Sequence, residues 1–462
     1  MAYHNRTTDD WQALDAAHHL HPFTDHKTLS EEGVRVIVRG EGPYIYDSDN
    51  RQILDAMAGL WNVNIGYGRD ELAEAGYEQM KELPFYNAFF KTTVPSATLL
   101  AAKLAELSPA HVNKVFFGSS GSESNDTAIR LVRHYWHLEG KPEKQTIIAR
   151  RLAYHGSTIA SASMGGMGAM HGQLHTPLPG FVHVMPPYQF GEGLPGESEE
   201  AFAARAARAI EDAILAAGPE TVAAVVGEPI QGAGGVKIPP AGYWPRVQEI
   251  CRKYDVLLMA DEVITGFGRT GHWFGSQYYG IEPDTMTVAK GITSGYVPLS
   301  AVLVGDRVAT TLAEKGGEFF HGYTYSGHPV ACAVALKNIE IIEQERLVER
   351  VRDETGPYLA ETLQRFEDHP IVGEVRSLGM LGAIELVADK ATRRRMTANE
   401  GEAGTVCRDH CFANDLVMRA VFDTMILSPP LSWTRAEIDE MAEKFARVLD
   451  QTAASAKERG WI

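Results

Sequence analysis

Residues 256–292 constrain the fold of this chain more than any other stretch. They contain two short apolar runs, 256–259 and 285–289, and a charged residue closely follows each: Asp261 and Lys290. Apolar runs of this length between turn residues are typical of buried strands in a parallel sheet. Ligands of an open α/β sheet bind just beyond the carboxyl ends of its strands, so we expect both charged side chains at a binding edge.

A carboxylate and an amine at neighbouring strand ends are the two groups that pyridoxal phosphate requires. The cofactor forms a Schiff base with a lysine and needs a carboxylate beside its pyridine nitrogen. Asp261 would keep that nitrogen protonated because an anion raises the pKa of an adjacent cation. Lys290 would act as nucleophile and then move protons. A buried structural ion pair between Asp261 and Lys290 explains these residues equally well.

A Gly/Ser-rich turn at 118–124 lies between a predicted strand, 114–117, and a predicted amphipathic helix, 125–135. Backbone N–H groups of such a turn can surround an anion, and the helix N-terminus adds a favourable field. Simple helix capping is the alternative. We predict that Ser120, Gly121 and Ser122 hold a phosphate.

Two more predicted strands, 145–149 and 221–226, end near further candidate residues. Tyr154, followed by His155, could stack on a pyridine ring, and Glu228 would lie at the same edge of the sheet. Val263 lies two residues beyond Asp261 and would pack on the opposite face of the ring.

Composition restricts the class of protein. The chain has 462 residues, enough for two domains, and a formal net charge of −17, which argues against nucleic acid or an anionic membrane as a partner. Residues 1–19 lack the apolar core of a signal peptide, and no apolar run approaches the roughly 18 residues of a membrane span. Four scattered cysteines do not form a disulfide framework. We therefore expect a cytoplasmic protein.

Two clusters suggest metal ligands at first sight. The segment HHLHPFT (18–24) holds three histidines, and Cys407 lies four residues before Cys411. Neither cluster brings the further ligands that a structural zinc site needs. A capping segment and two reduced cysteines on one helix are the simpler interpretations, and we expect no metal.

MADEVITGFGRTG (259–271) followed by DTMTVAKGI (284–292) resembles the class III (subgroup II) aminotransferases, in particular the ω-amino acid and amine:pyruvate transaminases. The resemblance extends from HHLHPFT to PPL (429–431). It implies an α/β fold of fold-type I, with a large, mostly parallel sheet domain and a smaller α+β domain. We predict an N-terminal segment, 1–68, that joins the small domain, a large cofactor-binding domain, 69–330, and a C-terminal small domain, 331–462.

The resemblance also assigns residues. It implies that Asp261 and Lys290 are catalytic, that Thr324 reaches the phosphate of the neighbouring subunit in a homodimer or in a tetramer made of two dimers, and that Arg419 binds a substrate carboxylate. A surface arginine in an exposed bend is the simpler alternative for Arg419. We predict that the substrate pocket is aromatic and apolar, built from Leu60, Trp61, Phe89, Tyr154 and Tyr323.

The number of cationic side chains near the substrate indicates which keto acid accepts the amino group. Relatives that use 2-oxoglutarate often have arginine directly after the aromatic-x-Gly turn, where this chain has Ser157. Arg419 then remains for a single carboxylate, and pyruvate carries only one. Arg150 or Arg151 could supply the second cation from elsewhere. We predict an aminotransferase that moves an amino group from an ω-amino acid or primary amine to pyruvate.

Other functions remain open at this point. A 2-oxoglutarate-dependent aminotransferase, or a mutase or decarboxylase of the same fold, would use the same cofactor-holding residues. A catalytically silent relative that binds a metabolite is the alternative outside enzymology, although the presence of both Asp261 and Lys290 argues against it.

Overall fold

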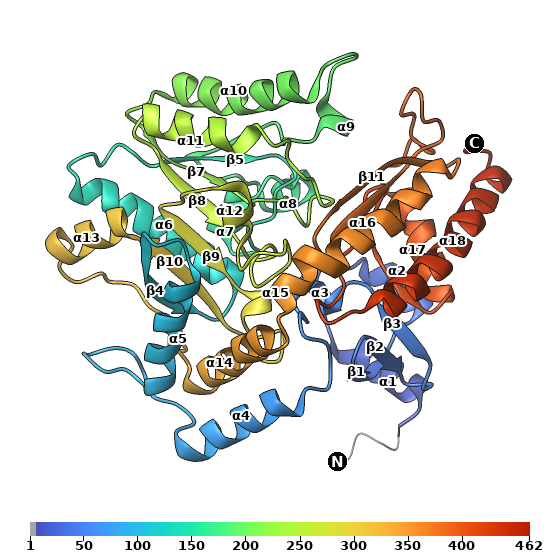
Figure 1. The fold of residues 1–462 in the computed structure, drawn as a ribbon, viewed down its shortest axis with the longest axis horizontal. Helices are drawn as coiled ribbons and strands as arrows, with labels where there is room; N and C mark the ends of the chain where they lie inside the picture. The colour runs from blue at the N-terminus through green and yellow to red at the C-terminus, as the bar shows by residue number, and fades with distance from the viewer. Residues whose placement is uncertain (1–5) are drawn as a thin grey trace.

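The computed structural model of the chain describes residues 6–462, so the first five residues of the polar N-terminal stretch lie outside it. A seven-stranded sheet organises the larger part of the molecule (Figure 1). Its order is β4-β10-β9-β8-β7-β5-β6. The strands from β6 to β9 pair in parallel, and β10 pairs antiparallel with both β9 and β4. The bounds are β4 (Val112–Gly118), β5 (Thr146–Arg150), β6 (Phe181–Val184), β7 (Val222–Gly227), β8 (Leu257–Asp261), β9 (Thr285–Val288) and β10 (Ser300–Gly305).

Helices cover both faces of this sheet because its strands are apolar on both sides. In β5, Ile147 and Ala149 pack in the core that contains α6 (Gly121–Leu138), whereas Ile148 packs against α10 (Glu199–Ala217) and α11 (Tyr243–Lys253). Further elements around the sheet are α4 (Asp70–Glu82), α5 (Pro95–Leu107), α7 (Ile159–Met164), α8 (Gly168–Leu174), α9 (Gln189–Glu192), α12 (Gly275–Tyr279), η1 (Lys290–Ile292), α13 (Asp306–Lys315) and α14 (Pro329–Gln344). Continuous apolar strands covered on both faces are what a buried parallel sheet requires.

A second, antiparallel sheet follows α14, with the order β11-β12-β15-β14. Its strands are β11 (Val372–Leu378), β12 (Leu381–Leu386), β14 (Arg419–Val421) and β15 (Thr424–Leu427). The helices of this part are α15 (Leu347–Arg350), η2 (Val351–Thr355), α16 (Gly356–Gln364), η3 (Arg365–Asp368), α17 (Glu402–Ala413) and α18 (Arg435–Glu458).

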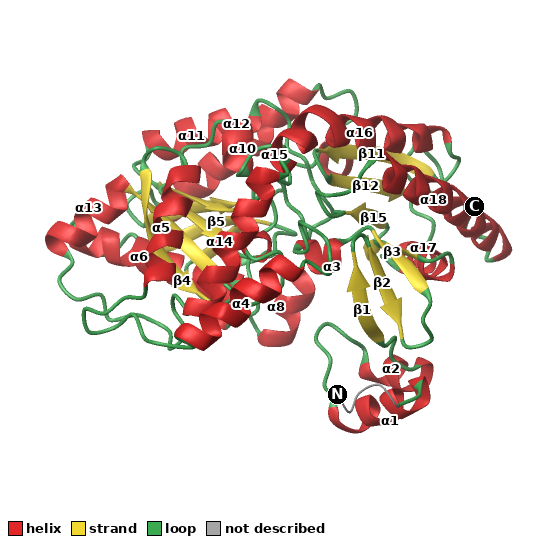
Figure 2. Cartoon of the chain, turned by 60° about the horizontal axis from the view of Figure 1, so that its bottom comes forward, coloured by secondary structure: helices red, strands yellow, loops and turns green. Residues whose placement is uncertain are grey.

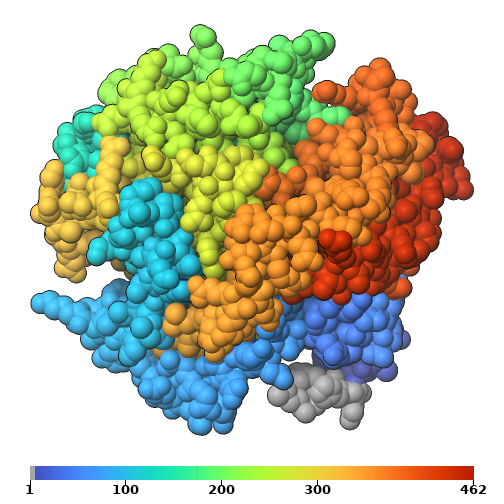
Figure 3. Space-filling view, in the orientation of Figure 1, coloured from blue at the N-terminus to red at the C-terminus, as the bar shows by residue number. Residues whose placement is uncertain are grey.

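The N-terminal and C-terminal parts of the chain lie side by side (Figure 3). Strands β1 (Ile37–Glu41), β2 (Tyr44–Asp47) and β3 (Gln52–Asp55) form an antiparallel sheet, and β13 (Leu416–Val417) extends it by pairing in parallel with β3. Helices α1 (Thr8–His18) and α2 (His26–Glu32) bury no residue and lie beyond this sheet (Figure 2). The short α3 (Ala58–Trp61) leads back toward the large sheet.

Some local expectations needed correction. The helix expected at 125–135 begins at Gly121, because the Ser120 side chain accepts a hydrogen bond from the Glu123 N–H (3.2 Å) and caps it inside the Gly/Ser turn. The Gly- and Met-rich composition of residues 164–180 predicts a mobile loop, but this stretch contains α8. Cys407 and Cys411 lie buried and free on α17, as expected. No helix among residues 6–462 has the length and apolar character needed to cross a bilayer.

Candidate active site

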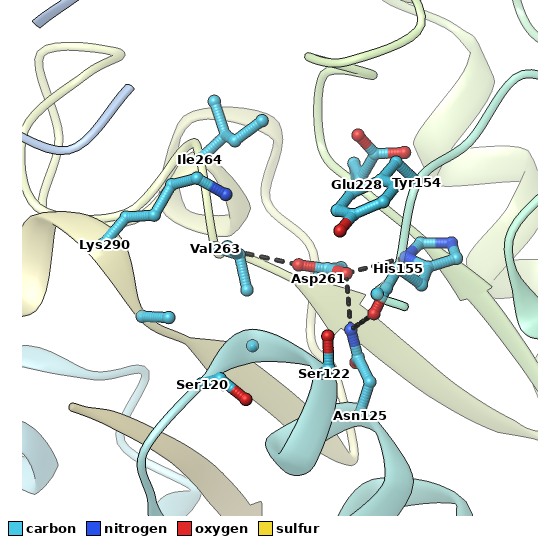
Figure 4. A pocket seen from close by; sticks show the side chains of 13 residues that line it. Ser120, Ser122, Asn125, Tyr154, His155, Glu228, Asp261, Val263, Ile264 and Lys290 are labelled. Atoms are coloured by element: carbon cyan, nitrogen blue, oxygen red, sulfur yellow. Dashed lines mark hydrogen bonds and ion pairs between the residues drawn. The ribbon is translucent and has the colours of Figure 1, made fainter. Parts of the chain in front are cut away.

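A cavity of about 210 Å³ lies at the carboxyl edge of the large sheet, where the strands β5, β7, β8 and β9 end (Figure 4). In this view Lys290 reaches in from one side, Asp261 and His155 lie on the other, and Ser120 and Ser122 lie on the helix below. Its lining contains every predicted cofactor residue except Thr324, and also Asn125, Gly156, Ile264 and Ala289. The predicted residues are Ser120, Gly121, Ser122, Tyr154, His155, Glu228, Asp261, Val263 and Lys290.

Asp261 ends strand β8 and is 3% exposed. Its Oδ2 lies 2.7 Å from His155 Nδ1 and accepts a hydrogen bond from Asn125 Nδ2 (2.9 Å), while Oδ1 accepts one from the Val263 N–H (3.1 Å). Burial raises the pKa of Asp261, but these hydrogen bonds, above all the one from His155, outweigh it and hold the pKa below its usual value. The carboxylate therefore stays charged although it is buried.

Lys290 begins the short η1 helix directly after β9, and its φ of 49° lies in the left-handed region. A bulky residue rarely adopts this conformation, and strain of this kind clusters at functional sites. Burial lowers the pKa of the Lys290 ammonium, and the nearby Asp261 and Glu228 oppose this only in part. A lowered pKa increases the fraction of neutral amine, which is the nucleophilic form.

Glu228 follows β7 and is 4% exposed. Its Oε2 accepts a hydrogen bond from the Gly232 N–H (3.0 Å). Its Oε1 and His155 Nε2 are both buried without a hydrogen-bond partner in the part of the chain that the structure describes. Burial raises the pKa of Glu228 to about 7. Buried polar atoms without partners at a cavity wall are typical of a site built for a polar ligand.

The start of α6 fits a phosphate. The Ser120 cap opens an 18-residue helix whose N-terminus carries a partial positive charge. Close backbone packing shapes this end of the cavity: a Cβ added at Gly156 would lie 2.3 Å from Ser161 Oγ and 2.7 Å from Ser122 Oγ. The Ser157 N–H donates to Ser122 Oγ (3.0 Å). An anion site, a charged carboxylate and a buried lysine in one cavity together match the groups that pyridoxal phosphate needs.

Of the residues predicted to bind substrate, only Tyr154 lines the cavity; Leu60, Trp61 and Arg419 lie outside its lining. The Arg419 guanidinium lies over the Trp61 ring, 4.9 Å from its centroid, and burial lowers the pKa of Arg419. Arg419 is therefore half-buried on β14 rather than in an exposed bend. Leu60, beside Trp61, is 55% exposed.

Phe89, Tyr323 and Thr324 do not line the cavity within one chain. Phe89 borders a separate groove beside Gly322, and Thr324 is exposed. The Tyr323 hydroxyl donates to the Glu123 carbonyl (3.0 Å), so this segment packs against the first turn of α6.

Neither arginine suggested as a second cation faces the cavity. Arg150 is 2% exposed, donates to the Glu228 carbonyl oxygen (2.6 Å) and lies over the Trp244 ring. Arg151 forms an ion pair with Glu192 (2.8 Å). This corrects the suggestion that Arg150 or Arg151 replaces the missing cation.

Two residues that sequence reasoning did not single out belong to the site. Asn125 contacts Asp261, and Phe23 places its exposed ring edge-on to Tyr154, at 6.2 Å between centroids. Phe23 has a φ of 50°, an unusual backbone conformation for an aromatic residue. Its place directly after HHLHP was the available signal, but the segment was interpreted only as a cap. The histidine cluster there hydrogen-bonds Asp15: His19 Nδ1 and His21 Nε2 lie 3.0 and 2.8 Å from its carboxylate.

Comparison with known proteins gives a consistent result. The sequence model of the family described as aminotransferase class-III matches residues 28–449. A putrescine–pyruvate aminotransferase from Pseudomonas aeruginosa is 55% identical over 98% of both chains. A diaminobutyrate–2-oxoglutarate transaminase from Halomonas elongata is 43% identical over 93% of this chain and 92% of its own. The solved omega transaminase from Pseudomonas jessenii in complex with PMP is 43% identical, with a TM-score of 0.94 over 96% of this chain and 99% of that one.

Proposed function

The chain belongs to the class-III aminotransferases, pyridoxal-phosphate enzymes of fold type I, and we propose that it transfers the amino group of a short diamine or related primary amine to pyruvate. The observation that carries this proposal is the placing of Asp261 and Lys290 in one cavity with the Ser120–Ser122 turn. The high identity to an enzyme named for putrescine and pyruvate supports the choice of substrates.

We assign the residues as follows. Ser120, Gly121 and Ser122 would bind the phosphate, Tyr154 and Val263 would enclose the ring, and Asp261 would face the pyridine nitrogen. When bound, pyridoxal phosphate carries the amino group between substrates and withdraws the electron pair of the carbon that loses a proton. Asp261 supports this because its carboxylate stays charged and keeps the nitrogen protonated. Lys290 anchors the cofactor and, as a neutral amine, accepts and returns the substrate proton.

Two buried polar atoms of the cavity wall would bind polar groups of the cofactor. Glu228 Oε1 and His155 Nε2 are buried and free of other hydrogen-bond partners among the described residues. A bound polar ligand removes the cost of leaving them unpaired. His155 also fixes the orientation of Asp261 through its Nδ1.

Pyruvate is the acceptor that the charges favour. A substrate carboxylate taken out of water needs a cationic or densely hydrogen-bonded partner. Arg419 supplies one cation, whereas Ser157 occupies the position after the Tyr154-His155-Gly156 turn, and Arg150 and Arg151 have other partners. The Halomonas relative named for 2-oxoglutarate is the observation that favours the alternative acceptor.

We further propose a homodimer with shared active sites. Large apolar side chains gather in the segments around Phe89 and Thr324: Phe90 is 90% exposed, Phe320 79% and Tyr325 59%. Burying such side chains against a second copy would remove a large apolar surface from water. Thr324 and Phe89 would then reach the partner's cavity. Four free, buried cysteines support a reducing compartment, and we propose the cytoplasm.

The test is a pair of half-reactions followed by absorption. Holoenzyme should lose its visible band when putrescine or another primary amine is added, and pyruvate should restore it. Lys290→Ala should bind pyridoxal phosphate without forming that band and should not turn over. An unchanged spectrum with every amine donor would refute the proposed function, and release of carbon dioxide would identify a decarboxylase instead.

A further inference from the structure

Asn125 lies one turn into α6 and connects three elements of the site. It is 1% exposed, and its side-chain amide donates to Asp261 Oδ2 (2.9 Å) and to the His155 carbonyl oxygen (2.6 Å). Its Oδ1 accepts a hydrogen bond from the Thr287 hydroxyl of β9 (2.9 Å). Both N–H donors of this buried side chain and one of the two lone pairs of its amide oxygen are therefore used.

The chemistry of its partners fixes the orientation of the amide. A carboxylate and a backbone carbonyl only accept hydrogen bonds, so the NH₂ group must face both of them. Turning the amide over would place its oxygen against the Asp261 carboxylate and leave two acceptors without donors. Asn125 is thus held in one orientation by its surroundings.

Asp261 is correspondingly restrained. Its Oδ2 accepts hydrogen bonds from Asn125 and His155, and its Oδ1 accepts one from the Val263 N–H (Figure 4). Rotation of the carboxylate would break these hydrogen bonds in a buried site, where unpaired groups are costly. Hydrogen bonds donated to the charged form also hold the pKa of Asp261 low, with His155 contributing more than Asn125.

The hydrogen bond between Asn125 and Asp261 also fixes the distance between the start of α6 and the end of β8. Asn125 belongs to the helix that begins at the phosphate-binding turn, and Asp261 ends β8. A hydrogen bond between the two ties the phosphate end of the cavity to the carboxylate end. A rigid cofactor that spans both ends needs this spacing to be constant.

We propose that Asn125 is a positioning residue that locks the Asp261 carboxylate, charged and in a fixed orientation, against the pyridine nitrogen of the cofactor. The inference rests on the proposed role of Asp261. Asn125 does not touch the reacting atoms in this account. Its effect passes through Asp261 and so should appear in the protonation of the ring nitrogen.

The experiment loads each variant with pyridoxal phosphate labelled with ¹⁵N in the ring and follows the ¹⁵N chemical shift with pH. Asn125→Ser and Asn125→Leu should lower the ring-nitrogen pKa by about one unit or more and reduce kcat by about tenfold or more. Thr287→Val is the matched control, because it removes a buried hydrogen bond to Asn125 but neither of the bonds that Asn125 donates. It should leave the ring-nitrogen pKa close to that of the wild type.

The variant Asp261→Asn tests the proposed role of Asp261 separately from that of Asn125. If Asp261→Asn leaves the ring nitrogen protonated as in the wild type, the proposed role of Asp261 is wrong. If Asp261→Asn changes the protonation but both Asn125 variants match the wild type, the locking role of Asn125 is wrong. A shift in Thr287→Val as large as in Asn125→Ser would also overturn it, since general loss of packing would then explain the effect.

Discussion

Replacing Glu228 with Gln should change how the stability of the cofactor-free chain depends on pH. Glu228 is 4% exposed, its Oε1 has no hydrogen-bond partner among the described residues, and burial raises its pKa from 4.5 to about 7. The folded chain therefore binds a proton at Glu228 more tightly than the unfolded chain does. Glutamine cannot titrate, so the variant lacks this contribution.

The sign and size follow from linkage. Because the folded pKa is the higher one, the stabilisation from this proton is fully present below pH 4.5 and is lost as pH rises to about 7. The difference between 4.5 and about 7, at about 1.4 kcal/mol for each pH unit, amounts to roughly 3.5 kcal/mol of unfolding free energy. Glu228→Gln should therefore gain stability relative to the wild type by about this amount between pH 4.5 and 7.

Paired urea titrations of the two cofactor-free proteins across this pH range measure the difference directly. Titrating groups that do not interact with Glu228 cancel in the comparison, whereas Asp261 and Lys290 respond to its charge and contribute to the measured difference. The hydrogen-bonding preference of the amide adds a constant offset. A difference in unfolding free energy that stays flat from pH 4.5 to 7 would show that Glu228 is ionised in the folded chain and would refute the reasoning.

Three further predictions concern the cofactor and the substrates. Arg419→Ala should slow the pyruvate half-reaction by about ten- to a hundredfold, which corresponds to the loss of a hydrogen bond to a charged group, while an uncharged aryl amine reacts almost normally. Equal losses of the two stopped-flow rates would count against carboxylate binding by Arg419. Gly156 has a φ of 140°, and a Cβ added there would lie 2.3 Å from Ser161 Oγ, so Gly156→Ala should lower the free energy of unfolding by about 1–3 kcal/mol and weaken cofactor binding. Equilibrium dialysis and melting curves equal to those of the wild type would contradict this. Mixing Lys290→Ala subunits with inactive Thr324→Asp subunits should restore activity through one intact site per mixed dimer, and no recovery despite verified mixing would exclude a shared site.

Much of the site could be predicted because its residues follow strands. Asp261 is the last residue of β8 and Lys290 closely follows β9, and parallel neighbours bring such positions to one edge. The Gly/Ser turn likewise precedes an amphipathic helix. Sequence periodicity carries this information, since it depends only on local structure and on the general geometry of parallel sheets.

Contacts between distant segments could not be predicted in this way. Arg419 reaches Trp61 only because β14 and α3 meet, and Phe23 reaches Tyr154 only because the N-terminal segment lies against the loop after β5. Asn125 looked like an ordinary helix residue, and its role depends on a hydrogen bond to Asp261, 136 positions away. The mobile loop expected at 164–180 was wrong because a Gly- and Met-rich composition does not prevent a short helix such as α8.

The proposed boundaries at residues 68 and 330 remain predictions. The pairing of β3 with β13 joins the N-terminal segment to the C-terminal part, and α14 begins at Pro329. Limited proteolysis of the holoenzyme with mass mapping would locate the boundaries experimentally.

The most direct test of the account compares keto acids as acceptors. One amine donor, putrescine, is used at saturation, and initial rates are measured side by side with pyruvate and with 2-oxoglutarate. We predict a clearly higher kcat/KM for pyruvate, because Arg419 would bind one carboxylate and Ser157, after the Tyr154-His155-Gly156 turn, supplies no second cation. A higher kcat/KM for 2-oxoglutarate would contradict the account.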